Sequence, residues 1–155
     1  MARFFFVFAI VLCLVALGAY VFQHMISSSV SAVGTTTPAS TTDAYMNATS
    51  DDIFVSVPKP AANVSDAISI SGFARGPWYF EAVFPVEVES ATGALIGHGQ
   101  AQAQAEWTTD QFVPFIANIS LDTQYSGAAT IILKKDNPSG DSAKDASLSI
   151  PIVIQ

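Results

Sequence analysis

The chain has 155 residues, of which half are apolar and 12% are charged, and its formal net charge is −7. An acidic surface repels phosphate backbones, so we expect no nucleic-acid partner. The single cysteine, Cys13, excludes an intrachain disulfide framework and a multi-cysteine zinc site. No cofactor is expected from this composition.

Residues 1–26 are predicted to be a membrane anchor or a signal segment. Positions 4–22 contain no charged side chain, and as a helix they would extend about 28 Å, close to the hydrocarbon thickness of a bilayer. Arg3 precedes this run and the next Lys or Arg is Lys59, which predicts a cytoplasmic N-terminus and an extracytoplasmic C-terminal domain. The length of the run favours a retained single-pass anchor, with cleavage and secretion as the alternative.

Residues 27–52 are predicted to be a flexible linker. The segment is rich in Ser, Thr and Ala and shows no apolar period of 2 or 3.6 residues. Such a segment buries too little apolar surface to offset its ordering entropy. We therefore expect it to hold the following domain away from the membrane.

From residue 53 onward the apolar period becomes two, which is typical of β-strands. In the segment 79–90, for example, alternate apolar residues are separated by Glu81, Glu87 and Glu89. The period predicts about seven strands, at 53–57, 67–74, 79–90, 95–104, 113–121, 128–135 and 148–154. This predicts an all-β domain over 53–155, an antiparallel immunoglobulin-like β-sandwich without the inter-sheet disulfide, with a small barrel as the alternative.

The sequence offers little for catalysis. Its two histidines are His24, at the predicted membrane boundary, and His98, between two glycines. No nucleophile-elbow, zinc-protease or phosphate-loop motif occurs. The alternating glutamates are best interpreted as a solvated strand face. We expect the protein not to be an enzyme.

The loop at 136–141 collects oxygen donors of the kind that bind calcium. Asp136, Asn137 and Asp141 are the calcium candidates. Their spacing is not that of an EF-hand loop, and Asn-Pro and Ser-Gly are ordinary turn sequences. The favoured interpretation is a hairpin loop without metal.

An arginine and three aromatic residues are the candidate binding residues. Arg75, Trp78 and Tyr79 lie close together in the sequence, and Trp107 stands at another strand edge. These residue types form binding hot spots and sugar-stacking platforms. The alternative is structural, with the aromatic rings in the core and Arg75 paired with an acidic residue, either Glu81 or Asp136.

Three Asn-x-Ser/Thr tripeptides occur, at Asn47, Asn63 and Asn118. They would be glycosylated only in a host that modifies exported proteins in this way.

Four sequence blocks carry a family resemblance: GFARGPWYFEAVFPV at 72–86, WTTDQFVPF at 107–115, KKDNPSG at 134–140 and IPI at 150–152. In this order they resemble the Gmad-type immunoglobulin-like domains of bacteria, the second type named for association with the germination protein GerM. The resemblance implies a non-catalytic extracytoplasmic sandwich, often membrane-anchored and sometimes joined to sporulation or germination modules. It supplies neither a ligand nor catalytic residues.

These features predict a membrane-tethered extracytoplasmic module that acts in protein interaction or envelope structure. Its expected partners are the membrane, through residues 4–22, and an envelope protein. The alternative is a module that binds glycan or cell wall through Trp78, Tyr79 and Trp107, aided by Arg75.

Overall fold

The computed structural model describes residues 41–155. The predicted membrane segment, residues 4–22, and residues 27–40 of the predicted linker lie outside this range. Within residues 41–155, no helix is long and apolar enough to cross a membrane.

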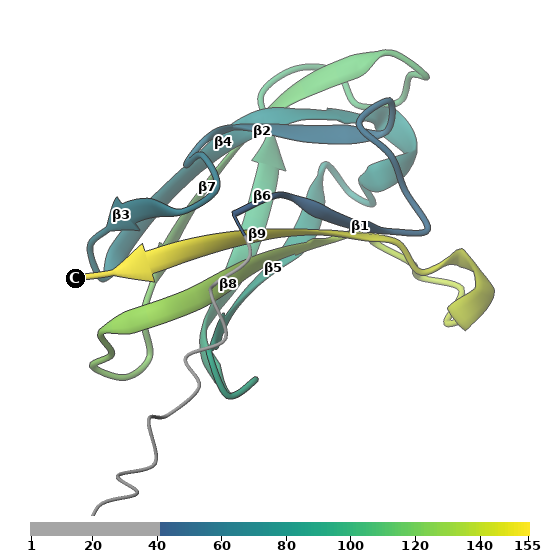
Figure 1. Cartoon of the computed structure of the whole chain (residues 1–155). Coiled ribbons are helices and arrows are strands. Elements are labelled where there is room, and N and C mark those ends of the chain that lie inside the picture. The colour runs from purple at the N-terminus through teal and green to yellow at the C-terminus, as the bar shows by residue number, and fades with distance from the viewer. Residues whose placement is uncertain (1–40) are drawn as a thin grey trace, which may run out of the picture. The chain divides into compact units, whose positions relative to one another are not determined.

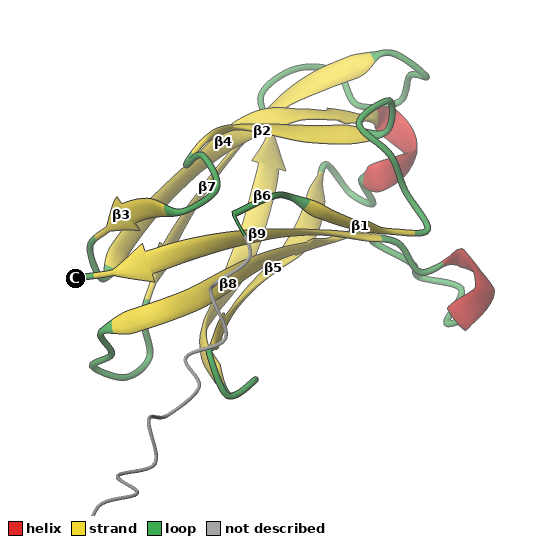
Figure 2. Ribbon diagram, viewed as in Figure 1, coloured by secondary structure: helices red, strands yellow, loops and turns green. Residues whose placement is uncertain are grey.

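Nine strands make up the described part of the chain (Figure 1). They are β1 (Ala44–Met46), β2 (Ile53–Val57), β3 (Ala62–Val64), β4 (Ala67–Arg75), β5 (Val83–Ser90), β6 (Leu95–Ala103), β7 (Phe112–Ser120), β8 (Gly127–Lys134) and β9 (Ser147–Ile154). The helical residues within 41–155 belong to two short 3₁₀ helices, η1 (Gly76–Trp78) and η2 (Ser142–Lys144), drawn red in Figure 2.

The strands are hydrogen-bonded in the order β1-β9-β8-β5-β6-β7-β4-β2. All neighbours on this path are antiparallel, whereas β3 pairs with β9 in parallel. The β6–β7 ladder has only two register pairs, Gln102 with Ile116 and Ala103 with Phe115. Here the path turns from one layer, with β2, β4 and β7, to the other, with β5, β8 and β9 (Figure 1). The orders β2-β4-β7-β6 and β5-β8-β9 correspond to the ABED and CFG sheets of an immunoglobulin sandwich.

The prediction of an all-β antiparallel fold is confirmed, and each of the seven expected strands is present. The strand count is nine, because β1 and β3 were not predicted. Each has only three residues, too few to show a period. Strand β1 falls inside the predicted linker and pairs with β9 from Ala44–Ser149 to Met46–Ser147. Part of the segment 27–52 therefore belongs to the β-fold.

Strand β5 begins later than the sequence predicted, at Val83 instead of residue 79. Glu81 and Ala82 have φ values of 51° and 67°, in the left-handed region that turns the chain. Phe80 bridges to Val83 across this turn. The alternation in the segment 79–90 predicts Phe80 on the same inward face as Phe84, and this is wrong, since Phe80 is 43% exposed whereas Phe84 is fully buried.

The core lies between the inward faces of the two layers. Phe84 of β5 is at its centre and makes edge-on ring contacts with Trp78, Tyr79 and Phe115, with centroids 6.0, 5.1 and 5.0 Å away. Edge-on packing is the favoured arrangement of aromatic pairs. The side chain of Phe84 is fully buried, so the core is organised around buried rings that include two of the binding candidates, Trp78 and Tyr79.

The open edge of β2 is covered by side chains. The carbonyl of Ile53 accepts a hydrogen bond from the Tyr45 hydroxyl at 3.3 Å, and that of Val55 accepts a long one from Lys59 Nζ at 3.5 Å. Proteins commonly protect strand edges in this way against pairing with another chain. Two carbonyl groups of the β2 edge are therefore already engaged within the domain.

Candidate functional site

Two of the predicted binding residues, Trp78 and Tyr79, are core residues. Strand β4 runs directly into η1, which places both rings against Phe84, and they are only 3% and 4% exposed. The Tyr79 hydroxyl donates to the Val113 carbonyl at 2.9 Å, and burial raises the pKa of Tyr79 above its ordinary value. Neither ring is accessible for stacking on a sugar.

Trp107 lies half-buried in the loop between β6 and β7 and packs against the edge of the core. Beside it is a shallow hollow of about 340 Å³ that Gly76 and Thr109 also line. The loop contacts η1 closely, because a Cβ on Gly76 would lie only 1.8 Å from the Thr109 carbonyl oxygen. Of the three aromatic candidates, only Trp107 reaches solvent.

Arg75 is held by backbone groups and not by the acidic residues expected from the sequence. Its Nε donates to the Asp51 carbonyl at 2.5 Å and its Nη1 to the Asp110 carbonyl at 2.8 Å. Within residues 41–155, the ion pairs are His98–Asp122 and Lys134–Glu87. Arg75 therefore has no carboxylate partner there, and the predicted pairing with Glu81 or Asp136 is wrong.

Three phenylalanines that the sequence analysis did not single out lie beside Arg75. Phe54, Phe73 and Phe112 come from β2, β4 and β7 and form what we call the aromatic cluster. The Phe54 and Phe73 rings stack at 5.2 Å, and Phe112 meets Phe54 edge-on at 5.4 Å. The three side chains are 37%, 38% and 36% exposed. The sequence did contain a signal for these residues. Each phenylalanine occupies an outward-facing position of a strand with alternating burial, where a polar residue is usual.

We call the outward side of β2, β4 and β7 the aromatic face. Beyond the cluster it carries Ile116, which is 45% exposed, and small neutral polar groups. Ser69 Oγ donates to Asn118 Oδ1 at 2.9 Å across the β4–β7 ladder. Arg75 is the only charged residue that these three strands contain. The aromatic face therefore combines apolar rings, one cation and no acidic side chain.

The calcium candidates lie in a loop whose polar groups form hydrogen bonds with one another. The Asn137 amide donates to the Asp141 carbonyl at 2.8 Å and to Asp145 Oδ1 at 2.7 Å. Asp141 Oδ1 accepts from the Ala143 backbone N–H at 3.1 Å and caps η2. Asp136 forms a backbone bond to Trp78. In the described part of the chain, no group of three or more His, Cys, Asp and Glu side chains is arranged to hold a metal.

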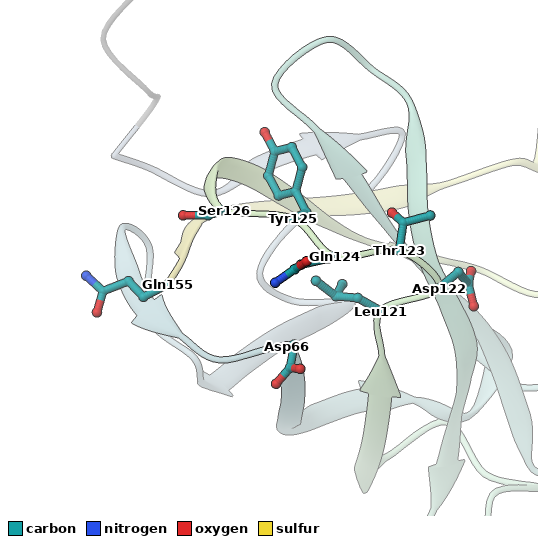
Figure 3. A pocket seen from close by; sticks show the side chains of 8 residues that line it. All are labelled: Asp66, Leu121, Asp122, Thr123, Gln124, Tyr125, Ser126 and Gln155. Carbon is teal, nitrogen blue, oxygen red and sulfur yellow. The ribbon is translucent and has the colours of Figure 1, made fainter.

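A larger hollow, of about 790 Å³, opens at the end of the domain where the β7–β8 loop, the turn before β4 and the end of β9 meet (Figure 3). Asp66 and Asp122 contribute its carboxylates. The Tyr125 hydroxyl is already engaged, since it donates to the Ala128 carbonyl at 2.7 Å. Asp122 pairs with the exposed His98 at 3.0 Å. The hollow is lined mainly by exposed loop residues, and their arrangement does not indicate a particular class of ligand.

The three Asn-x-Ser/Thr asparagines are all exposed. Asn47 donates to the Asp145 carbonyl at 3.0 Å, Asn63 lies in β3, and Asn118 accepts the bond from Ser69.

The family model of the immunoglobulin-like domain of bacterial spore germination, Gmad2, matches residues 52–142, more than half of the chain. The chain belongs to the Gmad2 family. The comparisons with curated proteins and with solved structures find no match. The Gmad2 match contains the aromatic cluster and Arg75, whereas β1 and β9 lie outside it. The family resemblance expected from the sequence is confirmed.

Proposed function

We propose that this Gmad2-family chain is a membrane-tethered, extracytoplasmic and non-catalytic module that binds another polypeptide through its aromatic face. The observation that carries this proposal is the exposure of Phe54, Phe73 and Phe112 beside Arg75 on one sheet. Aromatic residues, phenylalanine included, and arginine are enriched at the centres of protein interfaces.

The energy available from the cluster suits a specific but moderate interaction. At exposures of 36–38%, each phenylalanine leaves about 75 Å² of apolar surface accessible. Removal of the three surfaces from water contributes about 5 kcal/mol at ~25 cal/mol per Å². Since association itself costs several kcal/mol, the remainder of the face must also contribute.

The tethering part of the proposal is supported by the sequence. Residues 4–22 form an apolar run of bilayer length, with Arg3 before it and no Lys or Arg after it until Lys59. The link to germination is supported by the family description. The sugar-binding alternative keeps only Trp107 of its three aromatic residues, because Trp78 and Tyr79 are buried.

Photo-crosslinking in intact membranes tests the binding role. We would place p-benzoylphenylalanine at position 116 on the aromatic face and, as the matched control, at position 95 on β6. Ile116 and Leu95 are 45% and 55% exposed. The proposal expects a covalent polypeptide adduct from position 116 and none from position 95. Absence of a polypeptide adduct from position 116 would contradict it.

Labelling of intact cells tests the topology. Ser139 lies in an exposed loop, so a Ser139→Cys variant in a Cys13→Ala background should react with a membrane-impermeant maleimide added outside. Labelling only after cell lysis would reject the extracytoplasmic location.

A further inference from the structure

We propose that the polypeptide bound by the aromatic face is a second copy of this chain, docked face to face about a two-fold axis. This inference rests on the proposed function and adds the identity of the partner to it. Three observations support it: the distribution of charge, the size of the face, and the register of the residues along it.

The aromatic face is a surface on which two acidic copies can approach closely. The chain has 13 acidic and six basic residues, so two copies repel each other over most orientations. The strands β2, β4 and β7 contribute no carboxylate. The nearest acidic residues, such as Asp51, Asp66 and Asp110, lie in the loops at the two ends of the face. A face-to-face contact therefore buries apolar surface without opposing carboxylates.

The size of the face suits a weak dimer. Strand β4 has nine residues, so the face is about 30 Å long and, with three strands, about 15 Å wide. The aromatic cluster alone offers roughly 220 Å², far below the ~800 Å² per partner of a standard interface. The area of the entire face approaches that of the smallest specific protein interfaces. Anchoring of both copies in one membrane would raise their effective concentration and compensate for the small area.

The register selects the orientation of the dimer. Phe54 pairs with Phe73 and Phe73 with Pro114, so these residues form a row across the three strands. A two-fold axis along this row places each of them against its own copy, and Arg75 against Ser71 of the second copy. An axis along β4 would instead oppose two Arg75 side chains. We infer the first arrangement, because it keeps the two Arg75 side chains apart.

The product of the crosslinking at position 116 identifies the partner. The inference expects an adduct of twice the 16.3 kDa chain mass, containing this chain alone. An adduct with a different protein would overturn the second copy as partner and leave the proposed binding function intact. No polypeptide adduct would overturn both.

Sedimentation equilibrium of the full chain in detergent micelles provides an independent measurement. Phe73→Asp should weaken dimerisation at least tenfold, whereas Leu95→Asp, the matched exposed site on β6, should change it less than twofold. Circular dichroism of each variant verifies the β-fold. Equal dimer fractions in these variants and the natural chain would overturn the inference.

A charge pair at position 71 tests the orientation and changes no aromatic residue. In the proposed arrangement Ser71→Asp faces Arg75 of the second copy and strengthens the dimer, while Ser71→Arg weakens it. Net charge alone predicts the opposite order, because Ser71→Arg makes an acidic chain less acidic. A stronger dimer with Ser71→Arg than with Ser71→Asp would therefore reject the proposed axis.

Discussion

The guanidinium carbon of Arg75 lies 4.6 Å from the centre of the Phe112 ring, the distance of a cation–π contact. Two nitrogens of the same group donate to the carbonyls of Asp51 and Asp110. One side chain at the end of β4 thus ties together the segment before β2, the β6–β7 loop and the aromatic cluster. Its charge remains available on the aromatic face because it has no carboxylate partner among residues 41–155.

This geometry predicts that Arg75→Lys destabilises the domain. A lysine ammonium cannot reproduce the planar fork that reaches both carbonyls and stacks on the ring. We expect a loss of about 1–2 kcal/mol in the free energy of unfolding, measured by urea denaturation. Lys144→Ala, in the exposed helix η2, is the control and should change stability by less than about 0.5 kcal/mol. Equal stability of Arg75→Lys and the natural chain would show that the two carbonyl bonds contribute nothing.

The N-terminal boundary gives a second prediction. A fragment of residues 53–155 lacks β1, and with it the β1–β9 ladder and the Tyr45 hydroxyl that covers the Ile53 carbonyl. It also lacks the Asp51 and Asp52 carbonyls that accept hydrogen bonds from Arg75. We expect this fragment to unfold at a lower urea concentration than a fragment of residues 41–155 and to aggregate more readily, because the edge of β2 is open. Identical midpoints and light scattering would argue against a structural role for β1.

The period of two was sufficient to predict the seven main strands, because each has at least five residues and most of them, such as β4, β5 and β8, bury alternate side chains. It could not predict where β5 starts, since Phe80 and Glu81 continue the alternation and nothing in their residue types signals the left-handed turn. Strands β1 and β3 depend on pairing with β9 and have no periodic signal of their own.

The candidate site was predicted less well than the fold. The sequence indicated Arg75 but attributed the aromatic surface to Trp78 and Tyr79. These two rings instead pack in the core against Phe84. A segment rich in aromatic residues does not reveal which rings point outward. The aromatic cluster is built from three strands that are adjacent only after folding, so only the register of β2, β4 and β7 brings its rings together.

Gly76 is predicted to be irreplaceable at the start of η1. An added Cβ would lie 1.8 Å from the Thr109 carbonyl oxygen and 2.4 Å from that of Trp107, and both are backbone atoms that cannot rotate away. Gly76→Ala should lower the free energy of unfolding by at least about 2 kcal/mol. Gly97→Ala, with its nearest contact a leucine methyl at 3.2 Å, is the control and should have a much smaller effect. Similar thermal midpoints for the two variants would contradict the close packing of the β6–β7 loop.

The loop at 136–145 is predicted not to respond to calcium. Asn137 directs an N–H toward Asp145, and a donor in this position opposes a cation at the same carboxylate. The thermal midpoint should therefore be the same in EDTA and in millimolar calcium chloride. A calcium-dependent rise in the midpoint that Asp141→Asn abolishes would restore the metal-site interpretation.

The buried phenol of Tyr79 should make the free energy of unfolding depend on pH in the alkaline range. Burial raises the pKa of its phenol above the ordinary value of about 10. Below pH 10 both the folded and the unfolded states keep the proton, so stability is independent of this group. As the pH rises above 10, the unfolded chain releases the proton while the folded chain retains it, and stability falls by up to about 1.4 kcal/mol per pH unit.

Tyr79→Phe removes this dependence together with the hydrogen bond to Val113. At pH 8 the variant should be less stable than the natural chain by about 1–2 kcal/mol, because a buried hydrogen bond is lost. Between pH 10 and 11 the difference should shrink, since only the natural chain loses stability at Tyr79, and the other tyrosines contribute equally to both proteins. Urea unfolding at these pH values measures the difference, and a constant gap across the range would show that Tyr79 titrates alike in the folded and unfolded chain.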